Sequence, residues 1–144
     1  MSLATFKVTA ESENPTKTVV RAGNFEMIID EPKNLNGTDQ GPNPVEYVLG
    51  ALAGCLNVVG HVVAREMGFE LNGISFELEG DLDPAKFMGK ATENRAGYQE
   101  IRAKVKADSN ATEEQLRIWL AAVEARCPVS DNLSRSTPVK IVLN

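Results

Sequence analysis

The alternation of apolar and polar residues predicts a set of short strands. Period-two alternation is typical of half-buried strands, whereas apolar residues three or four positions apart are typical of helices. Strands are expected at Ala4–Ala10, Thr16–Arg21, Phe25–Ile29, Ile74–Leu78, Glu100–Ala107 and Val139–Leu143. The turn residues at 22–24 join the second and third of these strands, and Phe6 and Val8 share one face of the first. Residues 32–44 carry Pro, Asn, Gly and Asp without periodicity, which indicates a loop.

A long apolar helix is expected from Pro44 to about Met67, with Asn43 as its cap and Gly68 at its end. Its apolar residues wrap most of the circumference, so the helix should lie at the centre of the fold. These residues are Val45, Val48, Leu49, Leu52, Leu56, Val59, Val62 and Val63. Small residues at 50, 51, 53 and 54 would let a second helix approach, and the obvious one belongs to a second copy of the chain.

The same segment is long enough to raise the question of a membrane span. Residues 47–64 are apolar except for Asn57 and His61, and a run of this length is the lower limit for a spanning helix. Two polar residues and two glycines inside so short a run favour a buried helix of a soluble protein. No membrane association is expected.

A second helix begins at Thr112, whose spacing to Gln115 forms a capping box. Its apolar stripe comprises Leu116, Trp119, Leu120 and Val123. Residues 81–97 are polar and carry no clear pattern. Strands that come before and after two helices predict an α+β fold, with antiparallel strands around the long apolar helix.

Composition limits the function classes. A chain of 144 residues with 42% hydrophobic content is expected to form a single domain over 1–144 with a real core. The net charge of −5 and the lack of a Lys/Arg cluster argue against nucleic-acid binding. Residues 1–8 do not resemble a secretory signal, and two cysteines are no disulfide scaffold, so a cytoplasmic protein is expected.

The two cysteines are the candidate reactive groups. Cys55 continues the apolar face of the long helix, where a cysteine is more often a buried structural residue. Cys127 falls at the end of the second helix and precedes Pro128, so it is expected to cap a new helical turn whose free amides lower the thiol pKa. The pair can meet in the core, but two unrelated core thiols remain an equal reading of the spacing.

The residues do not support a metal site, a cofactor site or a thiol activated by histidine. Zinc takes three or four ligands, and two cysteines with one histidine show no ligand spacing, so neither a metal nor a cofactor is expected. His61 lies about 120° around the helix from Cys55, because each residue turns by about 100°. It cannot activate that thiol along the helix.

Two segments resemble the motifs of the OsmC/Ohr family. The run NPVEYVLGALAGC at 43–55 is similar to the helix motif that ends in the family's first cysteine. The run CPVSDNL at 127–133 resembles the second, Cys-Pro-x-Ser motif. The order of elements also fits, so the resemblance covers nearly the whole chain.

The resemblance implies an intertwined homodimer and a thiol peroxidase that reduces organic hydroperoxides. Cys55 would attack the peroxide and become a sulfenic acid, and Cys127 would condense with it to a disulfide that an external dithiol reduces. The resemblance also implies an apolar pocket lined by the long helix.

The sequence departs from the family pattern at two positions. The family's peroxidases carry a Glu ten residues before the first cysteine, where this chain has Val45, and Glu46 is one step later. The family's thiolate-stabilising Arg aligns near Asn14, whereas Arg21 is the sole arginine before the long helix. These departures keep open a second function class, a binding module for a small apolar molecule with idle or sensor thiols, and a third, two reduced core cysteines without a reaction.

Overall fold

The computed structural model describes all 144 residues, which form five strands, three α-helices and a 3-10 turn. The predicted α+β class is confirmed, and every strand pair is antiparallel. Residues 1–48 and 49–144 form two compact units. The expectation of a single domain over the whole chain stays a prediction.

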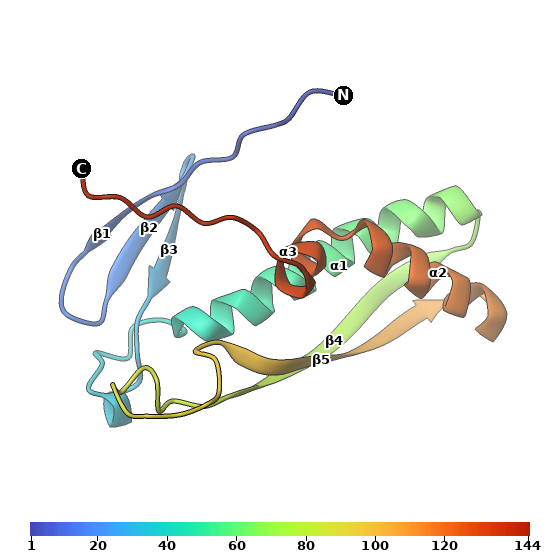
Figure 1. Ribbon diagram of the computed structural model, residues 1–144. Coiled ribbons are helices and arrows are strands. Elements are labelled where there is room, and N and C mark those ends of the chain that lie inside the picture. The colour runs from blue at the N-terminus through green and yellow to red at the C-terminus, as the bar shows by residue number, and fades with distance from the viewer. The chain divides into compact units, whose positions relative to one another are not determined.

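The first unit contains a three-stranded sheet in the order β1-β2-β3, formed by Thr9–Ser12, Thr18–Ala22 and Phe25–Ile29 (Figure 1). Gly23 takes a positive φ of 58° in the predicted turn, a conformation that glycine adopts without strain. The expected strand at 4–10 was wrong in its bounds, since β1 begins only at Thr9. Thr9 pairs with Arg21 near the end of β2, so residues before it find no partner there, and Phe6 is 92% exposed.

Asp30 organises the loop that follows β3. Its buried carboxylate accepts hydrogen bonds from the hydroxyls of Thr16 and Thr38 and from the backbone amides of Glu31, Thr38 and Gln40. Burial by itself raises the pKa of this carboxyl, but the hydrogen bonds outweigh it and hold the pKa well below its usual range. The loop contains the 3-10 turn η1 at Lys33–Leu35 and is otherwise irregular, as predicted.

Helix α1 spans Pro44–Met67, as the sequence predicts. Asn43 and Glu46 form a reciprocal cap, in which each side-chain oxygen accepts a hydrogen bond from the other residue's amide at 2.9–3.0 Å. The hydroxyl of Tyr47 donates to the carbonyl of Ile28 at 2.7 Å and ties the first turn to β3. Gly68 ends the helix with a positive φ of 77°.

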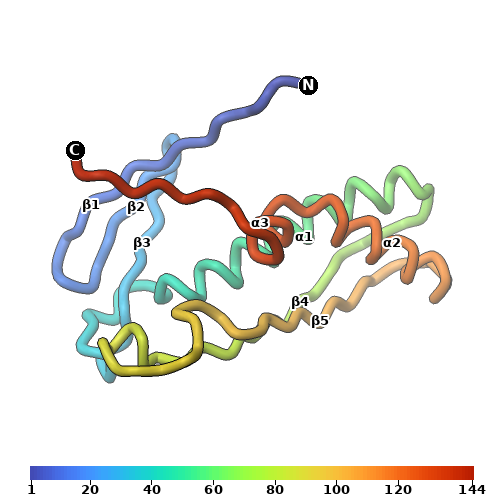
Figure 2. Tube along the Cα trace, viewed as in Figure 1, coloured from blue at the N-terminus to red at the C-terminus, as the bar shows by residue number.

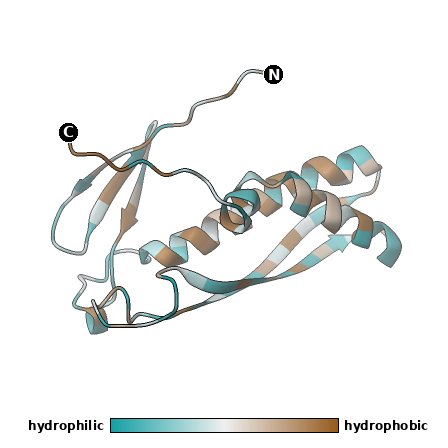
Figure 3. Cartoon of the chain, viewed as in Figure 1, coloured by the Kyte–Doolittle hydropathy of each residue, from teal (hydrophilic) through white to brown (hydrophobic).

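The second unit is built on a long hairpin of β4 at Leu71–Leu82 and β5 at Tyr98–Ser109 (Figures 1 and 2). Both strands extend beyond their predicted bounds. Alternate residues face the helices and are apolar, as the banding in Figure 3 shows. These inward residues include Ile74, Phe76, Leu78, Ile101, Val105 and Ala107. In the connecting loop, Asp83 accepts hydrogen bonds from the Ala85 amide and from the side chains of Thr92 and Asn94.

Helices α2, Glu113–Arg126, and α3, Pro128–Ser134, complete this unit. The capping box of Thr112 and Gln115 forms as predicted. The core lies where α1, α2 and the inner face of the hairpin meet, and its buried members are Leu52, Leu56, Val63, Ala64, Trp119, Val123 and Cys127. Leu120 was expected in the apolar stripe of α2 but is 41% exposed, because it lies about 100° around the helix from Trp119.

Two apolar segments remain uncovered within one chain. On α1 only five of the 24 residues are buried, and Val58 on the opposite side is 63% exposed. By length and composition alone, this helix would suffice to cross a bilayer. The predicted strand at 139–143 does not form, and its four apolar side chains are at least 77% exposed. A strand needs a partner, and no strand of the chain pairs with this segment.

We expect Asp30→Asn to lower the thermal midpoint at pH 7. The NH2 group of the asparagine side chain is a hydrogen-bond donor, and it would face hydroxyls and backbone amides that donate to the carboxylate in the parent protein. The folded pKa of Asp30 lies below its unfolded value, so the carboxylate stabilises the fold above about pH 4 and this contribution is lost as the pH falls. The gap between the parent protein and the variant should therefore shrink in acid. Circular dichroism melts against pH measure it, with exposed Asp39→Asn as the control. A pH-independent gap would contradict this account.

Candidate functional site

Cys55 lies in the middle of α1, at the border of the core. Its neighbours along the helix differ in their surroundings, since Leu52 and Leu56 are buried while Gly54 and Val58 are exposed. The thiol is half-buried and packs against the core cluster. A reagent can therefore reach it without the helix unfolding.

Cys127 occupies the junction between α2 and α3, as predicted. Its extended backbone, with φ −79° and ψ 113°, ends α2, because the proline that follows disfavours a helical conformation at the preceding residue. Pro128 then starts α3, and the sulfur of Cys127 accepts a hydrogen bond from the Ser130 amide at 3.4 Å. The side chain is only 1% exposed.

The structure places the two cysteines at the same core. Both are free, and Cys55 packs against the buried cluster that contains Cys127. The Cys55 thiol also contributes to the raised pKa of Cys127. The sequence left open whether the two thiols meet, and this placement favours a pair over unrelated core residues.

The electrostatics of Cys127 differ from the expectation. Burial raises the pKa of this thiol, and the Cys55 thiol raises it further. The amides of Ser130 and Val129 lower it, but by less than the other effects combined. The cap amides therefore lower the pKa of Cys127 as predicted, but burial outweighs them and the pKa is raised overall, which the sequence did not predict.

Two side-chain contacts join α2 to α1. The indole N–H of Trp119 donates to the carbonyl oxygen of Gly60 at 2.8 Å in the core. The guanidinium of Arg126, the residue before Cys127, bridges both carboxylate oxygens of Glu66 at 2.6 and 3.2 Å. The spacing of apolar residues predicts Trp119 on the inner stripe of α2 but does not predict either contact. A glycine inside an apolar helix was the available signal for close approach.

The two residues considered as substitutes for the family's acid and arginine have other partners. Glu46 caps the first turn of α1 with Asn43. Arg21 forms an ion pair with Glu26 across β2 and β3 at 2.7 Å. Asn14, at the position where the family's arginine aligns, accepts hydrogen bonds from the amides of Thr16 and Lys17. These contacts are structural.

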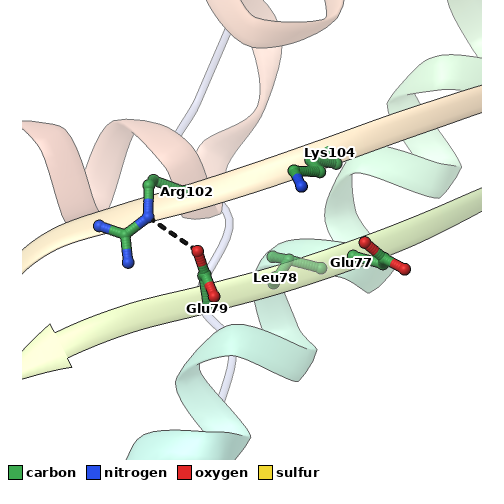
Figure 4. Close-up of a pocket in the computed structure, with 5 residues that line it drawn as sticks. All are labelled: Glu77, Leu78, Glu79, Arg102 and Lys104. Atoms are coloured by element: carbon green, nitrogen blue, oxygen red, sulfur yellow. Dashed lines mark hydrogen bonds and ion pairs between the residues drawn. The ribbon is translucent and has the colours of Figure 1, made fainter.

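Two shallow hollows lie on the hairpin, away from the thiols. One is lined by Glu77, Leu78, Glu79, Arg102 and Lys104, and Figure 4 shows Arg102 turned toward Glu79. Arg102 also pairs with Asp81 and Glu100. The second hollow lies further along the same strands. Neither is lined by α1, so the expected apolar pocket on the long helix is not among them.

Comparison with known proteins identifies the class. The family model for OsmC-like proteins matches residues 37–142. This range covers most of the chain and includes both cysteines, so the protein belongs to the OsmC-like family.

Individual relatives are more distant. An uncharacterised protein of Bacillus subtilis, YmaD, is 31% identical over 67 residues, and this match spans 46% of the chain and 45% of YmaD, less than half of that relative. An OsmC-like protein from Mycoplasma pneumoniae shares the fold with a TM-score of 0.79 at 20% identity, over 91% of this chain and 88% of that one. An organic hydroperoxide resistance protein from Elizabethkingia anophelis gives 0.65 at 17% identity, over 90% and 88%.

We expect iodoacetamide at pH 7.5 to label Cys55 before Cys127. Cys127 is buried and its raised pKa disfavours the thiolate, so its alkylation should be slower by at least about tenfold. Timed quenching followed by peptide mass spectrometry gives both rates, and the protein unfolded in urea serves as the control in which the difference disappears. Earlier labelling of Cys127 in the folded protein would contradict this site description.

Proposed function

We propose that this protein is a thiol-dependent peroxidase of the OsmC/Ohr type, which reduces organic hydroperoxides through Cys55 and Cys127. The observation that carries the proposal is the packing of a half-buried thiol, Cys55, against the core cluster that contains the buried thiol of Cys127. Two structural neighbours are named organic hydroperoxide resistance proteins, from Legionella pneumophila and Elizabethkingia anophelis. Such a cycle fits the reducing cytoplasm, where a disulfide is transient.

In this reaction the Cys55 thiolate attacks the outer peroxide oxygen, and the O–O bond breaks. The leaving alkoxide takes a proton and departs as an alcohol, while Cys55 becomes a sulfenic acid. The Cys127 thiol then displaces the sulfenic hydroxyl as water and forms the S–S bond. An external dithiol reduces this disulfide and is itself oxidised, which returns both thiols.

The exposure of the two thiols sets their roles. Cys55 is the one that a peroxide can reach, whereas Cys127 is 1% exposed and its raised pKa makes it a poor nucleophile toward a dissolved oxidant. A sulfenic acid on Cys55 would react with Cys127 much more readily than a dissolved oxidant does, because the two groups are held close together and need not meet by diffusion. Cys55 is therefore the attacking thiol and Cys127 the resolving thiol.

A second candidate function is the binding module for a small apolar molecule. Val45 stands where the family's peroxidases have an acid, and the carboxylate of Glu46 caps the helix. The guanidinium of Arg21 pairs with Glu26. These observations favour either a weaker peroxidase or a protein whose thiols do not react. Treatment with a hydroperoxide distinguishes the two.

The serine variants test the peroxidase. After substoichiometric cumene hydroperoxide, the parent protein should lose two hydrogens in mass and yield a peptide that links Cys55 to Cys127. Cys55→Ser should consume no peroxide, whereas Cys127→Ser should complete one turnover and stop at the sulfenic or sulfinic acid. Full activity of Cys55→Ser would reject the assignment, and unchanged thiols in the parent protein would support the binding module.

We also propose that the protein is a homodimer through the exposed side of α1. Added side-chain atoms at Gly50 and Gly54 would meet nothing within 4 Å in a single chain, so this face is open to a second helix. A second copy covers such a surface by a self-complementary contact of the same residues. Lipid is the other environment that an apolar helix of this length fits.

We expect Gly54→Leu to weaken the dimer at least about tenfold, because the larger side chain holds the two helices apart. Sedimentation velocity over a range of concentrations measures the dissociation constant. Ala121→Leu adds a leucine to the exposed side of α2 and serves as the matched control. A folded monomer of the parent protein at micromolar concentration, or recovery only with detergent, would overturn the dimer.

A further inference from the structure

We propose that Trp119 is the positioning residue for the resolving thiol. Its hydrogen bond to Gly60 fixes α2 against α1 in the position that places Cys127 in the core cluster against which Cys55 packs. This inference deepens the proposed function and rests on it for its purpose. The geometry itself belongs to the reduced protein.

The contact of Trp119 with α1 is tightly constrained. The indole is 3% exposed, and its ring meets Phe69 edge-on at 6.4 Å between centroids. Gly60 has no side chain that would keep the Trp119 indole at a greater distance. A Cβ on Gly60 would lie 3.1 Å from Cζ2 of Trp119 and 2.8 Å from Cδ1 of Ile74. The hydrogen bond and the missing side chain together set the separation of the helices.

The positions along the helices connect this contact to the thiols. Trp119, Val123 and Cys127 follow one another at four-residue spacing, so they share one side of α2 up to its end. Gly60 is five residues after Cys55, or about 7.5 Å along α1. A displacement of α2 at Trp119 therefore also displaces Cys127, because a helix of this length moves as a rigid element.

The ion pair of Arg126 with Glu66 is the second link between the helices, and it is the weaker one. Its side chains are 47% and 55% exposed, so water and salt screen the attraction. The buried hydrogen bond of Trp119 is not screened in this way. Trp119 is thus the link that holds α2 in place at physiological salt.

Disulfide formation is sensitive to such a shift. The Cα atoms must come within about 7 Å, and the S–S bond takes a narrow range of dihedral angles. When Cys127 is displaced, the sulfenic acid on Cys55 waits longer for the thiol that removes its hydroxyl as water. A second hydroperoxide then oxidises the sulfur to the sulfinic acid and leaves as an alcohol.

The effective concentration of the Cys55–Cys127 pair tests the proposal without any peroxide. It is obtained from the fraction of disulfide in buffers of reduced and oxidised glutathione. Trp119→Phe keeps a ring but loses the donor, and we expect the effective concentration to fall about tenfold. Gly60→Ala keeps the donor but pushes the indole away, and it should fall similarly.

Val105→Ala is the control for stability. Val105 packs on the core from β5, and its truncation lowers the thermal midpoint without loosening the contact between α1 and α2. A residue that only stabilises the fold acts equally on the reduced and oxidised forms, so the effective concentration in Val105→Ala should stay unchanged. An unchanged value in folded Trp119→Phe and Gly60→Ala, or an equal fall in Val105→Ala, would overturn the proposal. So would a parent protein that forms no Cys55–Cys127 disulfide in any of these buffers.

A second arm separates this proposal from the peroxidase. With cumene hydroperoxide, Trp119→Phe should yield a larger share of Cys55 sulfinic acid relative to disulfide than the parent protein and Val105→Ala. If the parent protein ignores the hydroperoxide while the glutathione results hold, the peroxidase fails and the positioning role of Trp119 stands. If the hydroperoxide is reduced with equal partition in all variants, the peroxidase stands and the positioning role fails.

Discussion

The close approach of α2 to α1 at Gly60 is the constraint on which the arrangement of the second unit depends. A glycine inside a helix costs about 1 kcal/mol relative to alanine, and here the buried hydrogen bond from Trp119 and the packing of its ring offset that cost. Because the helices meet at this point, the inner side chains of the hairpin can close the core beneath them. The end of α2 then falls beside the middle of α1. The placement of both cysteines at one core is thus a consequence of how these helices pack.

Burial gives the two thiols different properties. The cap of α3 offers the sulfur of Cys127 an amide, which by itself would favour the thiolate, yet the loss of water around the sulfur has the larger effect and raises the pKa. A protonated buried thiol is protected from stray oxidants and alkylating agents. The same burial would be a defect in an attacking thiol, but it suits a group that reacts only with its neighbour. Cys55 is half-buried within one chain and keeps an access to solvent that Cys127 lacks.

Local signals in the sequence identify the elements well and the contacts between elements poorly. The caps of α1 and α2 are predictable because Asn43 and Thr112 act on residues three positions away. Cys127 as a cap is likewise a local effect of Pro128. In contrast, the partners of Trp119 and Asp30 lie across the fold or in an irregular loop, where spacing carries no information. The strands at 4–10 and 139–143 fail for a related reason. Alternation predicts that a segment suits a sheet, but only the tertiary structure decides whether an edge is available.

The uncovered surfaces of the chain have a common physical explanation. A 24-residue apolar helix with five buried positions leaves apolar residues such as Val58 exposed, and exposed apolar patches of this kind are typical of interaction surfaces. The segment 139–143 adds unpaired backbone to exposed apolar side chains, and both sheets have free edges to which such a segment can pair. Within one chain, therefore, one face of α1 stays exposed and the segment 139–143 stays unpaired. A two-fold related copy would satisfy the helix face with its own equivalent residues and offer sheet edges to the free segment, whereas a lipid bilayer would cover the helix and leave the segment unpaired. A second copy would account for both features with one interaction, and it would place a partner helix beside Gly54 and Val58.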